Sequence, residues 1–314
     1  MDDKRNLIAA ILLSVAILLG WNFVSEKFFP TPAKPDVTKT VAGAPGATPA
    51  ATQGQPASAP PSGTPAVAAP VAKTTILPVE AALATGNRVP IETPSLAGSI
   101  NLVGARIDDI TLTKYRQTIE KNAPPVRLFA PGNSKAAYFA SVGWSAQGIE
   151  VPGPTTLWTA SGTKLTPATP VMLSWSNTTG QTFRVEYSID DNYLITAKQT
   201  IANAGSAPVA ASSFALLDRL GKPTDPHEKD SVTIHVGPTG FVDGKSEFDV
   251  DYKNLDNGEA FKYNSAAWLG FTDKYWLAAV IPAKGERVTA SITAPAADNY
   301  QTLFARDFKQ VAPG

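Results

Sequence analysis

The sequence contains no cysteine, which excludes a disulfide framework and thiolate metal sites. Histidine is almost absent as well, because only His227 and His235 occur. We expect His227 to lie in a turn and His235 on a strand, and neither to bind a metal. The lack of cysteine fits a reducing or an oxidising compartment equally well, so it does not predict where the protein resides.

Neither sign of charge prevails, since 27 Lys and Arg residues balance 27 Asp and Glu residues. No basic run follows the first eighty residues. Proteins that bind nucleic acid need a basic patch to neutralise phosphates. The sequence therefore argues against nucleic acid as a partner.

Recognisable catalytic motifs are also missing, and Gly-x-Ser-x-Gly does not occur. Two carboxylate pairs, Asp108-Asp109 and Asp190-Asp191, are predicted to lie in turns, with adjacent side chains on opposite faces. Gly237-Pro238-Thr239-Gly240 is predicted to form the end of a hairpin, and Asn177-Thr178-Thr179, a formal glycosylation acceptor, to form a turn. We predict no catalytic, cofactor-binding or metal-binding residue, and no enzymatic activity.

One long uncharged run, Leu7–Val24, is present. Eighteen residues in a helix span about 27 Å, close to the thickness of the hydrocarbon core. A cleaved signal peptide is the alternative, but the run is longer than its usual core and no small-x-small site follows. Trp21, Phe28 and Phe29 suit the membrane interface. The sequence predicts a retained transmembrane anchor over residues 1–28, and the later apolar run Tyr275–Ile281 is too short to be a second one.

Residues 29–78 are rich in Pro, Ala, Gly, Thr and Ser, and eleven prolines fall in this stretch. Such a composition cannot bury enough apolar surface to offset the entropy of ordering it. Frequent proline favours an extended chain of about 3.1 Å per residue. We therefore predict a disordered linker, with no site of its own, between the anchor and a folded domain over residues 79–314.

The folded domain shows the two-residue alternation of β-strands, with little helical periodicity. Phe183–Ile189 alternates apolar and polar side chains, Asp190-Asp191-Asn192 supplies a turn, and Tyr193–Ile201 alternates again. The fold class is predicted to be mainly β, as an antiparallel β-sandwich of two large sheets. Further predicted strands are Ile100–Val103, Ile107–Leu112, Val126–Phe129, Ala137–Trp144, Val171–Ser176, Phe214–Leu217, Val232–Val236, Phe248–Lys253, Trp276–Ile281, Val288–Thr293 and Tyr300–Phe304.

One cluster of aromatic residues stands beside an acidic and a basic residue. Such rings could stack on a sugar or bind a protein partner, while a core strand with one polar corner is the alternative. The candidate partner or ligand patch comprises Trp268, Phe271, Asp273, Tyr275 and Trp276.

Three stretches together resemble a known family. They are residues 1–7 (Met-Asp-Asp-Lys-Arg-Asn-Leu) with the helix that ends in Gly20-Trp21, residues 92–109 with Glu-Thr-Pro-Ser-Leu-Ala-Gly-Ser-Ile and Gly-Ala-Arg-Ile-Asp-Asp, and residues 268–279 (Trp-Leu-Gly-Phe-Thr-Asp-Lys-Tyr-Trp-Leu-Ala-Ala). In this combination the chain resembles the YidC membrane protein insertases of Gram-negative bacteria, over its whole length and in order.

The resemblance implies an inner-membrane protein with a cytoplasmic N-terminus and a periplasmic domain similar to galactose mutarotases, without their catalytic residues. It implies the bilayer, nascent membrane proteins and the Sec translocon with its accessory subunits as partners, and no cofactor. The family's insertion groove, built from five further helices, has no counterpart here, so we expect an N-terminal part of an insertase whose periplasmic domain is C-terminally truncated at Gly314. A membrane-tethered carbohydrate-binding or mutarotase-like sandwich and a purely structural scaffold that docks translocon subunits are the alternatives.

Overall fold

The computed structural model describes residues 76–85, 87–223 and 235–314. The predicted anchor, nearly all of the predicted linker, His227 and most of the predicted strand Val232–Val236 lie outside these residues. Within the three described ranges, no helix is both long and apolar enough to cross a bilayer.

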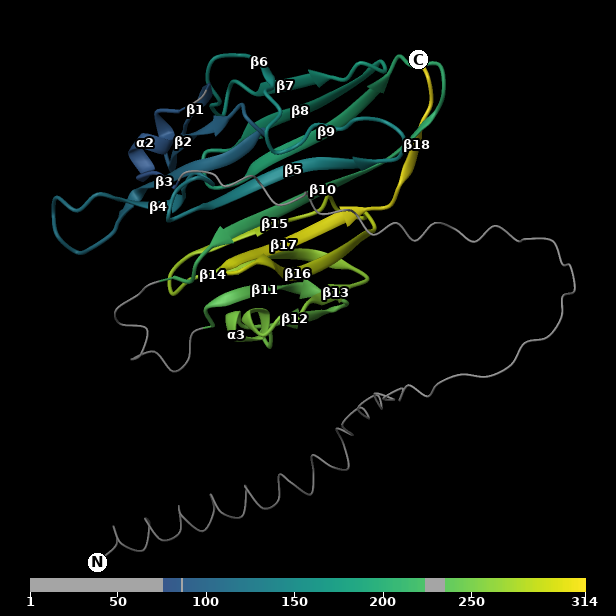
Figure 1. The fold of residues 1–314 in the computed structure, drawn as a ribbon. Helices are drawn as coiled ribbons and strands as arrows, with labels where there is room; N and C mark the ends of the chain where they lie inside the picture. The colour runs from purple at the N-terminus through teal and green to yellow at the C-terminus, as the bar shows by residue number, and fades with distance from the viewer. Residues whose placement is uncertain (1–75, 86, 224–234) are drawn as a thin grey trace, which may run out of the picture. The chain divides into compact units, whose positions relative to one another are not determined.

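Antiparallel strands make up most of the described chain, with one short helix before the first strand and another between β12 and β13 (Figure 1). The first helix and strands are α2 (Val79–Leu83), β1 (Arg88–Glu92), β2 (Leu96–Asn101), β3 (Arg106–Arg116), β4 (Pro125–Phe129), β5 (Tyr138–Ala146), β6 (Thr159–Ser161), β7 (Val171–Ser176), β8 (Gln181–Ile189), β9 (Ile195–Asn203) and β10 (Val209–Leu220). The remaining elements are β11 (Gly237–Val242), β12 (Lys245–Glu247), α3 (Tyr252–Asp256), β13 (Phe261–Tyr263), β14 (Ala266–Thr272), β15 (Leu277–Val280), β16 (Val288–Ala296), β17 (Asn299–Arg306) and β18 (Lys309–Val311).

The strands form three sheets where the alternation predicted two. A ten-stranded sheet runs in the order β1-β2-β3-β5-β10-β17-β16-β13, with β4 paired to β3 and β18 to β10. Two four-stranded sheets have the orders β12-β11-β14-β15 and β6-β7-β8-β9. Alternation reveals which face of a strand is buried but not which strands pair, so the number of sheets was not accessible from the pattern.

The hydrophobic core joins all three sheets through aromatic contacts made by β5. Trp144 meets Phe183 of β8 edge-on, with ring centroids 5.2 Å apart. Tyr138 meets Phe271 of β14 edge-on at 6.1 Å. Tyr138 and Trp144 are six residues apart and therefore point to the same side of β5. Both smaller sheets consequently pack on that side of the large sheet, where the core sits.

The β8–β9 hairpin confirms the prediction made from alternation. Phe183 and Val185 are fully buried, and Tyr187 is 1% exposed. The turn forms where it was predicted, because the side chain of Asp190 accepts hydrogen bonds from the backbone N–H groups of Asn192 (2.9 Å) and Leu194 (3.0 Å).

The elements predicted at Phe248–Lys253 and at Gly237-Pro238-Thr239-Gly240 are wrong. Over Phe248–Lys253 the chain enters helix α3, because Asp251 and Asn254 form a capping box that starts a helix. Residues 237–242 form β11, a strand rather than a hairpin end. Pro238 lies in the part of β11 that pairs with β14 alone, because β12 pairs only with Gly240–Val242. Proline is tolerated in such edge positions of a sheet.

His235 lies just before β11 and outside any strand. Its Nε2 lies 2.9 Å from the carbonyl oxygen of Pro238, and its ring meets Phe248 edge-on. His235 is therefore bonded within its own segment, and the expected strand position is wrong.

Candidate functional site

The predicted aromatic patch falls on β14 and on the tight turn between β14 and β15. The backbone N–H of Asp273 donates to the carbonyl oxygen of Trp276 at 2.8 Å and closes this turn. Exposure differs sharply along the patch: Phe271 is 1% exposed and Tyr275 is 71% exposed. The structure thus divides the five residues among different environments.

Phe271 lies in the core. Besides its contact with Tyr138, its ring stacks on Tyr252 with centroids 6.5 Å apart and planes at 4°. Its side chain is therefore used by the fold and is not presented to a partner.

Asp273 forms the polar corner of the turn. Its carboxylate accepts a hydrogen bond of 2.6 Å from the Arg219 guanidinium, which also lies 4.9 Å above the ring of Tyr138. Burial raises the pKa of the Tyr138 hydroxyl, so this phenol stays neutral beneath the guanidinium. The Arg219–Asp273 ion pair ties the turn to β10, and we assign it a structural role.

Trp268 lies on β14 opposite Phe241 of β11. Trp268 is half-buried and Phe241 is 39% exposed. This pair is a second, smaller aromatic surface that the sequence pattern did not distinguish from the rest of the patch.

Trp276 packs against a residue that the sequence analysis missed. The ring of Tyr115, at the end of β3, meets Trp276 edge-on with centroids 4.9 Å apart and planes at 71°. The Lys274 ammonium lies 5.4 Å from the centroid of the Tyr275 ring. The β14–β15 turn therefore adjoins the β3–β4 hairpin, although the two are far apart in the sequence.

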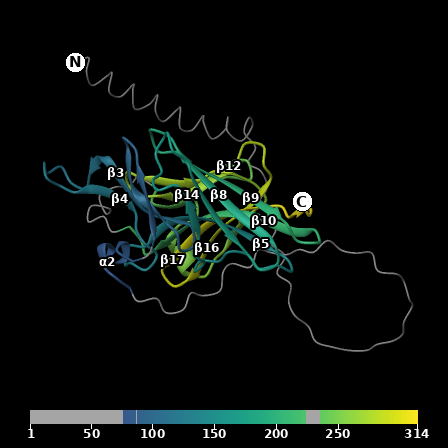
Figure 2. The same cartoon turned by 90° about the horizontal axis from the view of Figure 1, so that it is seen from above.

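The connection between β3 and β4 projects beyond the strands, at the left of Figure 1 and again in the view from above in Figure 2. Backbone hydrogen bonds from Gln117 to Pro124 (3.0 Å) and from Ala123 to Glu120 (3.1 Å) close the loop. Ile119, near its apex, is fully exposed at 106%. We call the following set the hairpin surface: Lys114, Tyr115, Arg116, Ile119, Lys121, Lys274, Tyr275 and Trp276.

A second constellation surrounds the two carboxylates of β3, which the sequence predicted to lie in a turn. Ser99 pairs with Asp109 and Ile100 pairs with Ile107, so Asp108 is the extra residue of a β-bulge. The prediction of a turn is therefore wrong. The bulge also overturns the expectation that the two side chains point to opposite faces.

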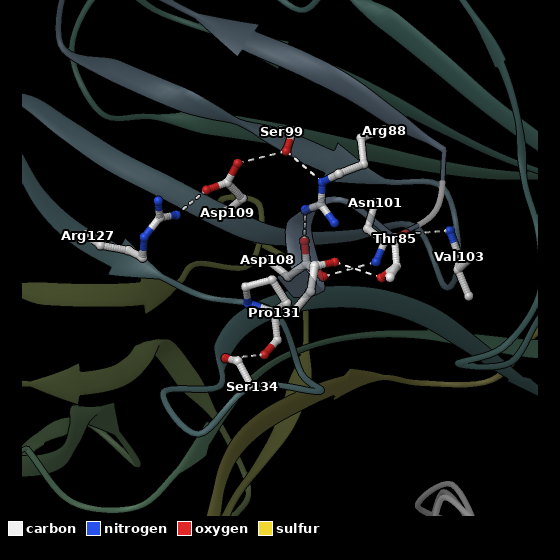
Figure 3. Close-up of polar contacts among 11 residues, drawn as sticks. Thr85, Arg88, Ser99, Asn101, Val103, Asp108, Asp109, Arg127, Pro131 and Ser134 are labelled. Carbon is white, nitrogen blue, oxygen red and sulfur yellow. Dashed lines mark hydrogen bonds and ion pairs between the residues drawn. The ribbon is translucent and has the colours of Figure 1, made fainter. Parts of the chain in front are cut away.

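Both carboxylates belong to one polar network (Figure 3). Arg88 donates to Asp108 and, at 2.8 Å, to the hydroxyl of Ser99. Ser99 in turn donates to Asp109 at 2.8 Å, and Arg127 also donates to Asp109. Asp108 is 1% exposed. Because arginines and a hydroxyl occupy the carboxylate oxygens, this arrangement stabilises the sheet and does not present an acid and a base to a substrate.

A further carboxyl group gives a pH-dependent prediction. Burial raises the pKa of Asp218 above its ordinary value of 3.8, although hydrogen bonds from Gln301 and Asn299 oppose part of the shift. The folded state therefore holds this proton more tightly than the unfolded chain. The stabilising contribution of the protonated Asp218 carboxyl is present below pH 3.8 and is lost as the pH rises through the folded-state pKa of this group.

Asp218→Asn removes this titration. We expect the free energy of unfolding of the variant, relative to wild type, to increase from about pH 3.5 to pH 7. Urea unfolding at the two pH values measures the difference. A relative stability that stays constant or falls with rising pH would contradict this assignment.

Comparison with known proteins relates these elements to a family. A family model described as the YidC periplasmic domain matches residues 88–314, which include the polar network and the hairpin surface. The chain belongs to the YidC family. The family resemblance seen in the sequence is thereby confirmed.

The YidC relatives align along the whole chain. The membrane protein insertase YidC of Paracoccus denitrificans (strain Pd 1222) is 38% identical over 355 residues, which cover 100% of this chain and 53% of that protein. The YidC of Bradyrhizobium diazoefficiens is 35% identical over 333 residues, covering 100% and 52%. The YidC of Rhizobium johnstonii is 38% identical over 332 residues, covering 100% and 53%. The chain therefore spans about half the length of these YidC relatives.

Among solved structures, a galactose mutarotase-like protein from Lactobacillus casei ATCC 334 aligns with a TM-score of 0.44 and 11% identity. The alignment covers 73% of this chain and 96% of that one.

Proposed function

We propose that this chain forms the anchor, the tether and the periplasmic domain of a bacterial inner-membrane insertase, with its N-terminus in the cytoplasm. The alignment of named insertases along 100% of the chain, including residues 1–75, carries the proposal. The uncharged run Leu7–Val24 supports the anchor, and the proline-rich stretch after it supports the tether.

Insertion of nascent membrane proteins needs no cofactor and no bond chemistry. A polar group left unsatisfied in hydrocarbon costs several kcal/mol, and an insertase lowers that cost with a polar path through the bilayer. We place this path outside residues 1–314. We assign the periplasmic domain a docking role without enzymatic activity, which agrees with the engagement of Asp108 and Asp109 by arginines.

We infer that the domain is a large β-sandwich of the galactose mutarotase type. The packing of both four-stranded sheets on one side of β5 supports a layered arrangement. A sandwich of this size offers sheet edges to partners.

Strand β15 is the edge we propose for docking a subunit of the Sec translocon or one of its accessory proteins. It ends the order β12-β11-β14-β15 and has no strand beyond it among the described residues. Leu277 is 49% exposed and Ile281 is 61% exposed. An extended segment can add to an edge strand by main-chain hydrogen bonds. The test places a photocrosslinker at Leu277 and, as an exposed control, at Ala168. If neither position captures a translocon component in membranes, this docking surface is refuted.

The proposed function is tested in cells depleted of their own YidC protein. We expect residues 1–314 joined to the remaining part of the Paracoccus denitrificans relative to restore insertion of a test membrane protein. We expect residues 1–314 alone not to restore it. Restoration by residues 1–314 alone would contradict the proposal that the path for insertion lies outside these residues.

A further inference from the structure

The hairpin surface combines charges of one sign with an exposed apolar apex. In the loop and the strand end before it, Lys114, Arg116 and Lys121 are opposed by a single acidic residue, Glu120, and all four side chains are exposed. Lys274 lies in the adjoining β14–β15 turn, beside the ring of Tyr275. The chain as a whole is neutral, so this local excess of positive charge sets the surface apart.

Ile119 is the most exposed large apolar residue of the described chain, at 106%. No other described residue covers it, although the loop around it is closed by its own hydrogen bonds. A large aliphatic side chain held at the apex of an ordered loop gains by leaving water when a second apolar phase is present.

Aromatic rings surround the base of the hairpin. Tyr115 is 45% exposed, Tyr275 is 71% exposed, and Trp276 is half-buried against Tyr115. Tyr and Trp have an apolar body and a polar end, which suits them to the boundary between lipid headgroups and acyl chains. The hairpin surface thus carries an apolar apex, basic side chains and interfacial aromatic rings, which are the three features of a peripheral membrane contact.

We propose that the hairpin surface docks on a bilayer that contains anionic lipid, with Ile119 entering the headgroup region and Lys114, Arg116 and Lys121 pairing with lipid phosphates. The inference rests on the proposed function in one respect, because the anchor must hold the domain near a bilayer. It goes beyond that function by giving the periplasmic domain a second, direct contact with the membrane. Charge complementarity favours lipid over a protein partner, since a narrow hairpin with one aliphatic residue among basic side chains offers little of the apolar core that protein interfaces need.

The test uses the full chain, which has no cysteine and therefore accepts a single label. Asn122→Cys, in the exposed loop three residues after Ile119, carries an environment-sensitive fluorophore, and the exposed Ala168→Cys carries it as a control. Both proteins are reconstituted in vesicles of phosphatidylcholine with or without phosphatidylglycerol, and spin-labelled lipid serves as the quencher. Both labelled proteins share one anchor and one linker, so they differ only in the position of the label.

In vesicles with phosphatidylglycerol, we expect strong quenching at position 122, weak quenching at position 168, and relief of quenching by salt. Lys114→Glu, Arg116→Glu and Lys121→Glu together should reduce the quenched fraction about fivefold or more, because the reversed charges are repelled by the anionic surface. Ile119→Ser should also weaken the contact while leaving its salt dependence intact.

Four other results would overturn the inference. Equal quenching at both positions would indicate a non-specific approach of the domain to the vesicle. If the chain sediments with the vesicles but its label is not quenched, the docking surface is rejected and the proposed anchor is retained. If the chain stays in the supernatant, both the docking surface and the anchor are rejected. A label at position 122 that responds to an added membrane protein, but not to lipid, would make the surface a protein-docking site instead.

Discussion

Asp108→Ala is expected to lower the free energy of unfolding by about 3 to 5 kcal/mol, the usual cost of removing one partner from a buried ion pair. Asp108 is 1% exposed and accepts hydrogen bonds from Arg88 and, at 3.1 Å, from Asn101. The Arg88 side chain is itself only 10% exposed. The substitution leaves this guanidinium buried without its counter-ion, and urea unfolding of the full chain in detergent, followed by tryptophan fluorescence, measures the loss.

The matched control is Asp191→Ala, in the other pair of adjacent carboxylates. Asp191 lies in the exposed β8–β9 turn, where its backbone carbonyl accepts from Ser95 and is unaffected by the substitution. We expect a change within about 0.5 kcal/mol. Similar losses in the two variants would contradict the structural role of the network around the bulge.

Gly270→Ala is expected to lower the free energy of unfolding by about 3 kcal/mol, at the upper end of overpacking effects. Gly270 lies on β14 between β11 and β15. A Cβ atom there would lie 1.9 Å from the carbonyl oxygen of Ala278 and 2.8 Å from the Cα of Ala279. These are backbone atoms of the neighbouring strand, so relief of the clash requires β14 and β15 to separate.

Gly153→Ala provides the control for the loss of glycine itself. An added Cβ would meet nothing within 4 Å, and the residue does not have a positive φ. We expect a change below about 1 kcal/mol, in either direction. The same urea titration compares the two variants, and equal losses would show that the close approach of β14 and β15 does not limit stability.

Local pattern predicted the strands whose neighbours in sequence are also their neighbours in space. The bounds predicted for β7, Val171–Ser176, are those observed. Its partner β8 carries the same alternation, and the β8–β9 turn follows from the preference of Asp190 for backbone hydrogen bonds.

The incorrect predictions have physical causes that cannot be recognised in a single sequence. The bulge at Asp108 depends on the register between β2 and β3, which alternation cannot detect. Helix α3 was missed because the apolar spacing of Phe248, Val250 and Tyr252 imitates a strand, while the capping pair Asp251 and Asn254 decides for a helix.

The candidate site was only partly predictable. Tyr275 and Trp276 were named in the candidate patch, but Tyr115, which packs against Trp276, comes from a strand more than a hundred residues earlier. Phe271 belongs to the same aromatic cluster but lies on β14 with its side chain in the core, whereas Tyr275 and Trp276 lie in the turn after that strand. A signal for the hairpin was present in Lys114–Lys121, where Ile119 stands alone among polar and charged residues.

The most direct test of the proposed function is the side of the membrane on which the folded domain, residues 79–314, lies. Ala168→Cys in the full chain, expressed in a Gram-negative host, can be treated in intact spheroplasts with a maleimide that does not cross the inner membrane. The account predicts that the chain stays in the membrane pellet after carbonate extraction and that position 168 is labelled from outside. A chain recovered in the soluble fraction, or one labelled only after the spheroplasts are lysed, would contradict it.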